Sequence, residues 1–192
     1  MLSEMYCLKC RKITDTVPNT IFIAVVRSKS KRLQPMSKGV CTVCGTKKNK
    51  FIPKTPLTNI DIEGYARGID DFRGVFSRDN LPKKVDLRGS YIVNLDSKDG
   101  SGTHWVACHV NKNEKYYFDS FGLPPPKEIV KFLDGKPHAV DNSKYPSGDH
   151  HLIVYNTSQI QDMSEVICGH ICLMVLYRLN HGSLFSEILD IL

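Results

Sequence analysis

The chain has 192 residues, of which 41% are hydrophobic and 24% are charged, and its formal net charge is +6. This composition is typical of a globular protein and excludes a disordered or fibrous chain. The longest wholly apolar run covers residues 21–26, far short of the ~20 residues that a membrane-spanning helix needs. We therefore expect a soluble, intracellular protein.

Two Cys-x-x-Cys pairs lie in the first part of the chain, separated by a long segment. Four thiolates arranged in two such pairs suit tetrahedral zinc, which predicts a small zinc-ribbon-like unit. The alternative is a pair of disulfides, which the odd total of seven cysteines disfavours. We also expect no secretory signal. The expected zinc ligands are Cys7, Cys10, Cys41 and Cys44.

A strand is predicted over residues 20–26, followed by a basic loop. Residues 1–55 hold twelve Lys or Arg and two acids, whereas the remainder holds 14 bases and 18 acids. A compact basic unit of this kind suits the phosphate backbone of DNA or RNA. The alternative is a solvated lysine-rich face. The candidate nucleic-acid contacts are Arg27, Lys29, Lys31 and Arg32.

Two prolines within residues 52–56 mark the expected domain boundary. Residues 1–55 would form the basic zinc-ribbon-like module, and residues 56–192 are long enough for one compact α+β domain. In that domain we expect a helix over residues 60–76, strands over 91–96, 103–110, 116–120 and 151–156, a short helix over 126–133 and a long helix from 164 onward.

Two of these strands carry a candidate base and its acid. Residues 103–110 alternate as a strand, and residues 111–114 are typical of a hairpin turn. With an even loop, Val110 opposes Lys115, and Asp119 falls on the face of His104. An odd loop or a bulge would turn Asp119 away.

The last long helix carries a candidate nucleophile. Cys168 lies in or just before its first turns, where unpaired amides and the helix dipole favour a thiolate. Gln161 lies in the preceding polar loop, where a neutral amide can donate to a developing oxyanion. Gly169 is expected to leave room for a substrate backbone beside the sulfur. His104, Asp119, Gln161 and Cys168 together fill the roles of a thiol acyl-transfer site.

Structural interpretations compete with these assignments. A cysteine in the apolar stripe of a helix is often a core residue, which is the competing interpretation of Cys168 and the one that we expect for Cys172. Cys108 shares the strand face of His104 but has no acid or base arranged for it, so we expect it to be a core residue as well. The pair His150 and His151 could imitate a metal site. Surface or structural positions are nevertheless expected for these two, as for the remaining histidines, His109, His138, His170 and His181.

The motifs around these residues resemble the adenovirus-type (adenain-like) cysteine proteases, including those of Polinton or Maverick elements and related DNA viruses. The resemblance covers about residues 57–192 and rests on Gly102-Thr103-His104-Trp105, Phe118-Asp119-Ser120-Phe121-Gly122, Gln161 before Cys168-Gly169, and residues 69–82. It implies a papain-like fold with a central sheet and a packed nucleophile helix. It also implies Cys168 as nucleophile, His104 as base, Asp119 as orienting acid and Gln161 as oxyanion donor. Residues 5–54 resemble, less specifically, a small zinc-ribbon family of such viral elements.

Three functions follow as hypotheses. The resemblance implies a maturation protease that cleaves capsid and core precursors beside small residues such as Gly, in a virion or in the cytoplasm or nucleus of a host cell. Adenovirus enzymes carry Glu at the acid position, whereas Asp119 matches the proteases of ubiquitin-like modifiers, which share the fold. The third hypothesis is a non-enzymatic nucleic-acid-binding protein. Structural zinc is the one expected cofactor, and none is expected for catalysis.

Overall fold

The fold is given by a computed structural model that describes residues 3–30, 32–112, 114–134 and 153–192. Its strands are β1 (Glu4–Cys7), β2 (Lys12–Asp15), β3 (Phe22–Arg27), β4 (Leu33–Val40), β5 (Lys47–Phe51), β6 (Phe72–Ser77), β7 (Arg88–Asn94), β8 (Trp105–Asn111), β9 (Glu114–Phe118) and β10 (Ile153–Tyr155). Its helices are α1 (Asn59–Tyr65), α2 (Lys127–Asp134), α3 (Cys168–Asn180) and α4 (Phe185–Asp190), with 3₁₀ turns η1 (Pro18–Thr20) and η2 (Ala66–Gly68). None of the helices in the described ranges is long and apolar enough to cross a membrane.

The largest sheet has five strands in the order β10-β9-β8-β7-β6. Its outer pairs are parallel and its inner pairs are antiparallel. The alternation along β8 divides its side chains between two cores, as the sequence predicts. Val106, Cys108 and Val110 pack with α2 on one face, and Ala107 packs with α3 on the other. The expected mixed α and β architecture around a central sheet is confirmed.

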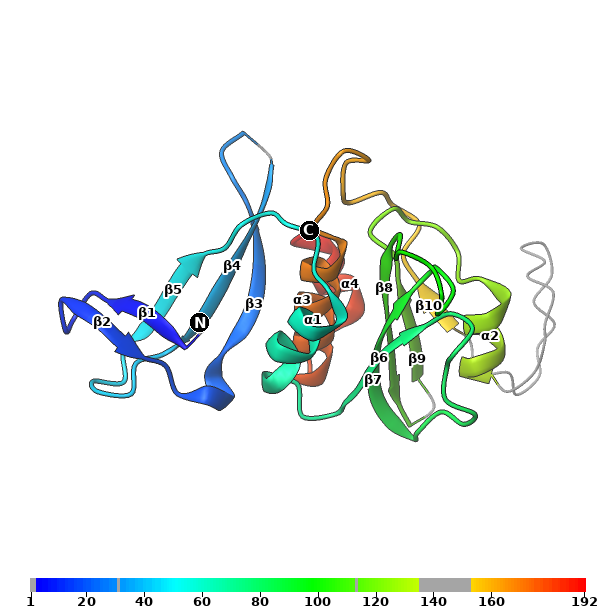
Figure 1. The fold of residues 1–192 in the computed structure, drawn as a ribbon, viewed down its shortest axis with the longest axis horizontal. Coiled ribbons are helices and arrows are strands. Elements are labelled where there is room, and N and C mark those ends of the chain that lie inside the picture. Colours follow the sequence, from blue (N-terminus) through cyan, green and yellow to red (C-terminus); the bar gives the residue numbers. More distant parts are fainter. Residues whose placement is uncertain (1–2, 31, 113, 135–152) are drawn as a thin grey trace.

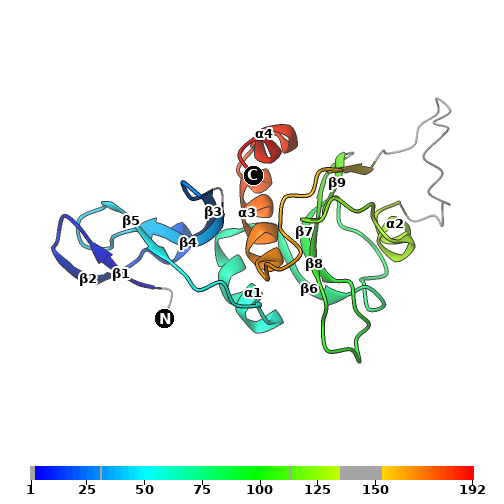
Figure 2. The ribbon, with the colours of Figure 1, turned by 90° about the horizontal axis from the view of Figure 1, so that it is seen from above.

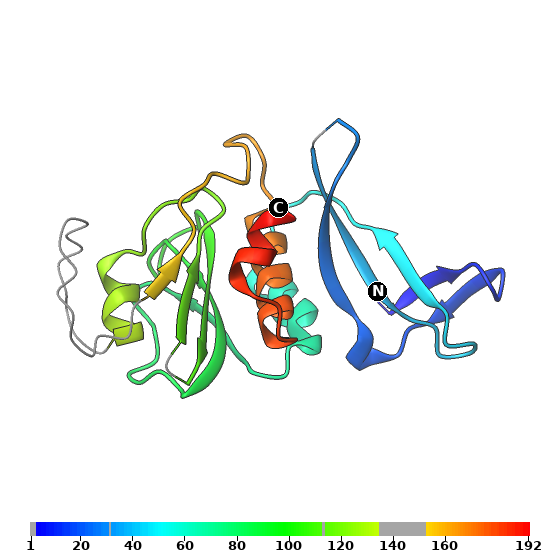
Figure 3. The same cartoon turned by 180° about the vertical axis from the view of Figure 1, so that it is seen from behind.

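The molecule is layered (Figure 1). Views from opposite sides place α1, α3 and α4 between the five-stranded sheet and the N-terminal strands, with α2 on the outer face of that sheet (Figures 1 and 3). The view from above gives the same order (Figure 2). The N-terminal strands form a sheet β3-β4-β5 and a separate hairpin β1-β2.

Helix α3 is buried on all sides between these layers over residues 169–176. A helix that is apolar around its whole circumference needs a cover on each side. The five-stranded sheet covers one side and β3 the other, where the Val25 N–H donates to Met174 Sδ at 3.1 Å. The Phe22 ring stacks on Tyr177 with ring centroids 4.1 Å apart. Residues 1–55 and 56–192 therefore share a core at this interface, and their division into two domains stays a proposal.

The sequence prediction of a helix over residues 60–76 is wrong in its second half. Helix α1 ends at Tyr65, η2 follows, and residues 72–77 form β6, which pairs in parallel with β7. Val75 and Phe76 pack against the cores on the two faces of the sheet. Gly74, with φ of +131°, lies at a register shift where a helix could not continue.

Helix α3 ends at Asn180, two residues before a glycine with left-handed backbone. Gly182 has φ of +82°, and the N–H of Ser183 donates to the Arg178 carbonyl at 3.0 Å. These are features of a Schellman cap. The helix begins at Cys168 and not at residue 164, and residues 164–167 form irregular backbone.

Candidate active site and candidate metal centre

His104 and Asp119 meet at one end of the central sheet. The register pairs Val110 with Lys115, as an even hairpin loop predicts. His104 lies one residue before β8 and Asp119 one residue after β9, so both side chains project beyond the paired strands. His104 Nε2 and Asp119 Oδ1 are 2.8 Å apart. The predicted pairing of these two residues is therefore present in the structure.

Asp119 is fully buried and held from several directions. Its Oδ1 also accepts the N–H of Phe121 at 2.8 Å, and the Phe121 ring stacks on the His104 imidazole. Asn156 brackets the Asp119 backbone, since its Oδ1 accepts the Asp119 N–H at 3.1 Å and its Nδ2 donates to the Asp119 carbonyl at 2.7 Å. The sequence prediction missed Asn156. The only local signal was a lone amide directly after an apolar strand.

Cys168 is the first residue of α3 and is partly exposed. The first N–H groups of a helix have no partner within it, so the sulfur lies beside unpaired donors. Because His104 Nε2 bonds Asp119, Nδ1 is the nitrogen left for the sulfur. Burial of the imidazole favours its neutral form. The hydrogen bond with Asp119 and the neighbouring Cys168 outweigh that effect and raise the pKa of His104 from 6.5 to about 9.

Gln161 is almost fully buried in the loop before α3. Its Oε1 accepts the Ser120 hydroxyl at 3.3 Å, and its Nε2 donates to the Glu165 carbonyl. A primary amide has two N–H donors, so one remains for another acceptor. Gln161, His104 and Cys168 line the same groove.

This groove has a volume of about 770 Å³ and runs past the sulfur of Cys168. Its walls combine mostly apolar and uncharged polar side chains with the charged Lys98 and Glu165. The apolar and uncharged ones include Leu57, Val75, Phe76, Met163, Val166, Asn80, Asn94, Ser97, Ser101 and Thr103. Gly169 does not leave the expected space for a substrate. A Cβ there would lie 3.2 Å from Trp105 Cδ1 and 3.4 Å from Leu57. The glycine allows α3 to approach Trp105, whose Nε1 donates to the Leu57 carbonyl.

The other two cysteines of this part of the chain are core residues, as expected. Cys108 is fully buried, and burial raises the pKa of its thiol. Cys172 is also fully buried, and its thiol donates to the Trp105 carbonyl. His109 and His170 are buried structural residues and His181 is exposed, while His138, His150 and His151 lie outside the described residues.

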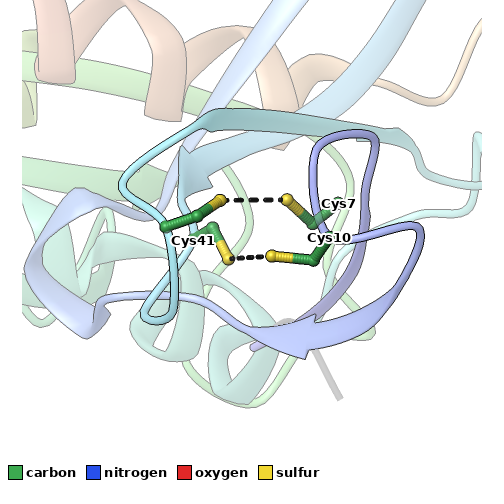
Figure 4. A group of neighbouring side chains, drawn as sticks. Cys7, Cys10 and Cys41 are labelled. Atoms are coloured by element: carbon green, nitrogen blue, oxygen red, sulfur yellow. Dashed lines mark hydrogen bonds between the residues drawn. The ribbon is translucent and has the colours of Figure 1, made fainter.

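The four N-terminal cysteines converge on one point (Figure 4). Their sulfur atoms all lie within 4.8 Å of one another, with Cys7 and Cys44 at 3.5 Å and Cys10 and Cys41 at 3.9 Å. A tetrahedron with Zn–S bonds of about 2.3 Å has edges of about 3.8 Å. All seven cysteines are free. The cluster therefore has the size and the donors to hold a metal ion.

Both Cys-x-x-Cys turns have the same backbone feature. The residue after the second cysteine is left-handed in each turn, Arg11 with φ of 53° and Gly45 with φ of 69°. Such a turn directs successive N–H groups toward the sulfurs. At Cys41, the Thr14 hydroxyl lies 3.2 Å from the sulfur and lowers the pKa of the thiol.

A buried lysine lies behind this cluster. Lys48 Nζ donates to the carbonyls of Thr14 at 2.7 Å and Asp15 at 2.8 Å and to Thr14 Oγ1 at 3.1 Å. A buried ammonium is costly without compensating partners. Four thiolates around a divalent ion carry an excess of negative charge, which this ammonium would offset through Thr14. No local pattern in the sequence indicates this role, because Lys48 is one of several lysines in β5.

The basic loop forms the turn between β3 and β4, closed by a hydrogen bond from Ser28 N to Arg32 O at 2.8 Å. Arg27, Lys29 and Arg32 are exposed, whereas Lys31 lies outside the described residues. Their predicted contact with nucleic acid remains a prediction.

Comparisons with known proteins find similarity at the level of structure only. No family model matches the chain, and no curated protein matches it. Four chains of solved structures match. One is the crystal structure of the ASFV pS273R protease, with a TM-score of 0.49 and 17% identity over 72% of this chain and 62% of that one. The chain thus spans less than two thirds of that protein's length, and the roles of its residues have to be argued from its own geometry.

Proposed function

We propose that the chain is a cysteine endopeptidase, a hydrolase with Cys168 as nucleophile, His104 as base, Asp119 as orienting acid and Gln161 as oxyanion donor. The observation that supports this proposal best is the continuous series from buried Asp119 through His104 to Cys168 on the wall of a groove. Structural roles alone would not require a partly exposed thiol at the start of a buried helix, beside an imidazole held by a carboxylate.

The reaction would proceed through a covalent intermediate. His104 takes the thiol proton, and the sulfur attacks the carbonyl carbon of the scissile peptide. The free N–H of Gln161 donates to the oxyanion that forms. The carbon–nitrogen bond then breaks as His104 returns the proton to the leaving amine, which leaves a thioester. Water that His104 deprotonates hydrolyses the thioester, and the thiol is regenerated. Asp119 holds the imidazole and stabilises its protonated form.

The proposed substrates are protein precursors. The resemblance to adenovirus-type proteases implies cleavage of viral or virus-like capsid and core proteins beside small residues such as Gly. A protease of ubiquitin-like modifiers is the second candidate, because Asp119 at the acid position is the residue that those enzymes use.

Parallel digestion tests both candidates. We expect the chain to cleave internal bonds in peptides that contain Gly-Gly, and to cleave matched peptides with Leu in place of Gly much more slowly. Mass spectrometry of rapidly quenched reactions should find the acyl group on Cys168. Processing confined to the C-termini of ubiquitin-like proteins would favour the second candidate. Absence of cleavage in every substrate would contradict the endopeptidase proposal.

We further propose that the four-cysteine cluster holds structural zinc, with Cys7, Cys10, Cys41 and Cys44 as ligands. Tetrahedral thiolate sites prefer this ion, and no cysteine of the cluster is left for catalysis. The metal would stabilise the N-terminal turns and supply no chemistry to the groove. The Lys48 ammonium would offset the charge of the thiolates through the Thr14 hydroxyl, which contacts both Lys48 and the Cys41 sulfur.

The charge of the N-terminal part supports a second binding function, contact with DNA or RNA. Substituting Arg27, Lys29, Lys31 and Arg32 together by Gln should weaken DNA binding and flatten its dependence on salt, by about one unit of logarithmic slope for each phosphate that is no longer neutralised. Peptide hydrolysis should stay nearly intact. Binding measured across a salt series checks this, with Lys83→Gln and Lys84→Gln, two exposed lysines outside the basic part, as the control. No detectable DNA binding by the unchanged protein would contradict this second function.

A further inference from the structure

We propose that Lys54 is a positioning residue, which fixes the Gln161 loop through its ion pair with Glu165. This inference rests on the proposed function, because it concerns the donor that would stabilise the oxyanion. It assigns to the N-terminal part of the chain an effect on the groove through Lys54.

Glu165 is held at both ends. Its side chain accepts Lys54 Nζ at 2.9 Å, and both partners are only partly exposed, 31% for Lys54 and 18% for Glu165. Its carbonyl accepts Nε2 of Gln161. Glu165 therefore pairs with Lys54 through its carboxylate and orients the Gln161 amide through its backbone carbonyl. A shift of Glu165 would turn the remaining N–H of Gln161.

The loop that contains Gln161 and Glu165 separates two clefts. Gln161 and Glu165 line the groove of Cys168 on one side and a second cleft, of about 710 Å³, on the other. The first half of the loop is tied to the domain, because the N–H groups of Ile160 and Gln161 donate to the Ser120 carbonyl. The second half is more open, since Met163 is 75% exposed and Val166 is 43% exposed. An ion pair has more influence where packing is sparse.

Lys54 is itself fixed by the N-terminal sheet. Ile52 is buried in the core shared with α3, its N–H donates to the Pro35 carbonyl at 3.1 Å, and its carbonyl accepts Gln34 Nε2 at 3.2 Å. The backbone two residues before Lys54 is therefore anchored to β4. A partly buried lysine on an anchored segment loses less entropy on pairing than a lysine on a free tail.

The chemistry predicts which reactions should depend on Lys54. Peptide hydrolysis passes through an oxyanion, so it depends on the position of Gln161. Alkylation of Cys168 by iodoacetamide forms a carbon–sulfur bond and releases iodide, without an oxyanion at any stage. It depends on the ionised sulfur and on access to it. A change that only moves Gln161 should therefore slow hydrolysis and leave alkylation unchanged, whereas a damaged fold would affect both.

The test compares Lys54→Ala with the unchanged protein. Complete loss of an oxyanion donor lowers kcat by 10²- to 10³-fold, so a misplaced donor should lower it by about five- to twenty-fold. KM should change little, and the rate of Cys168 alkylation should stay the same. Gln161→Ala should likewise lower kcat without changing the rate of alkylation, and its loss of kcat should be larger. Lys50→Ala, which removes an exposed lysine of the same part of the chain, should affect neither reaction.

Charge exchange supplies the second measurement. Lys54→Glu should be at least as harmful as Lys54→Ala, and adding Glu165→Lys should restore most of kcat, because the ion pair is re-formed in reverse. An unchanged rate of hydrolysis by Lys54→Ala, or equal losses in the rates of hydrolysis and alkylation, would overturn this inference and leave the proposed function standing. An unchanged protein that cleaves no peptide would overturn the proposed function, and this inference with it.

Discussion

Replacing Cys168 by Ala is expected to abolish peptide cleavage and labelling by thiol-directed probes while the protein stays folded. Removal of a nucleophile lowers kcat by roughly 10⁴-fold or more. The side chain is only partly buried at the first position of α3, so its loss should leave little cavity. His104→Ala should be as severe in hydrolysis, since no other described side chain is placed to take the thiol proton. Peptide hydrolysis, mass spectrometry of the labelled chain and thermal unfolding provide the three measurements.

Cys108 provides the matched control for this prediction. It lies in β8, fully buried among apolar side chains, and burial raises the pKa of its thiol, so a probe should not reach it in the folded protein. Cys108→Ala is therefore expected to keep both labelling and hydrolysis. Labelling that persists in Cys168→Ala and disappears in Cys108→Ala would show that our proposal names the wrong nucleophile.

The pairing of His104 with Asp119 could be predicted because it depends on local rules. Alternation along two neighbouring strands and an even turn determine which residues face each other. The turn does pair Val110 with Lys115, and the imidazole and the carboxylate meet just beyond the strands. The cysteine cluster could be predicted for a similar reason, because the Cys-x-x-Cys spacing of metal ligands within each turn is chemically specific.

The missed features depend on contacts between distant segments. Residues 72–77 form β6 by pairing in parallel with β7, a contact that their own apolar pattern did not specify. Asn156, which follows β10, holds Asp119. Lys54 pairs with Glu165, although more than half of the sequence lies between them. Their side chains are ordinary polar residues in sequence, and only the tertiary structure gives them partners.

The shared core has a sequence signal that a division into two domains leaves unexplained. Residues 168–176 are almost wholly apolar, which is typical of a helix covered on two sides. Residues 21–26 form an apolar run without alternation, which is typical of a strand buried on both faces. In the structure these segments, α3 and β3, pack together. A small appended ribbon would have no need of such a strand.

Zinc removal is therefore expected to affect more than the N-terminal turns. The protein should carry about one zinc per chain, and apparent zinc affinities of such sites, about 10–16 kcal/mol, exceed the stability of many domains. Chelation should unfold β1, β2 and the two Cys-x-x-Cys turns. Two independent domains would confine the loss to residues 5–52. Because β3 and β4 share a core with α3, we expect the main unfolding transition of the whole chain to fall as well, by at least about 5 °C.

Metal analysis, hydrogen exchange and thermal unfolding test this expectation together. Exchange should rise first over residues 4–16 and 41–47, and then over β3 and the exposed end of α3. The double variant Cys41→Ser with Cys44→Ser should lose the metal and melt like the chelated protein, whereas Cys172→Ser, a substitution of a buried thiol outside the cluster, should retain the metal. Zinc that survives the double variant would exclude these four cysteines as the ligands. Chelation that opens only residues 4–16 and 41–47, with an unchanged main transition, would instead mean that β3 keeps its place on α3 through apolar contact alone, and that the metal acts on the turns and not on the core.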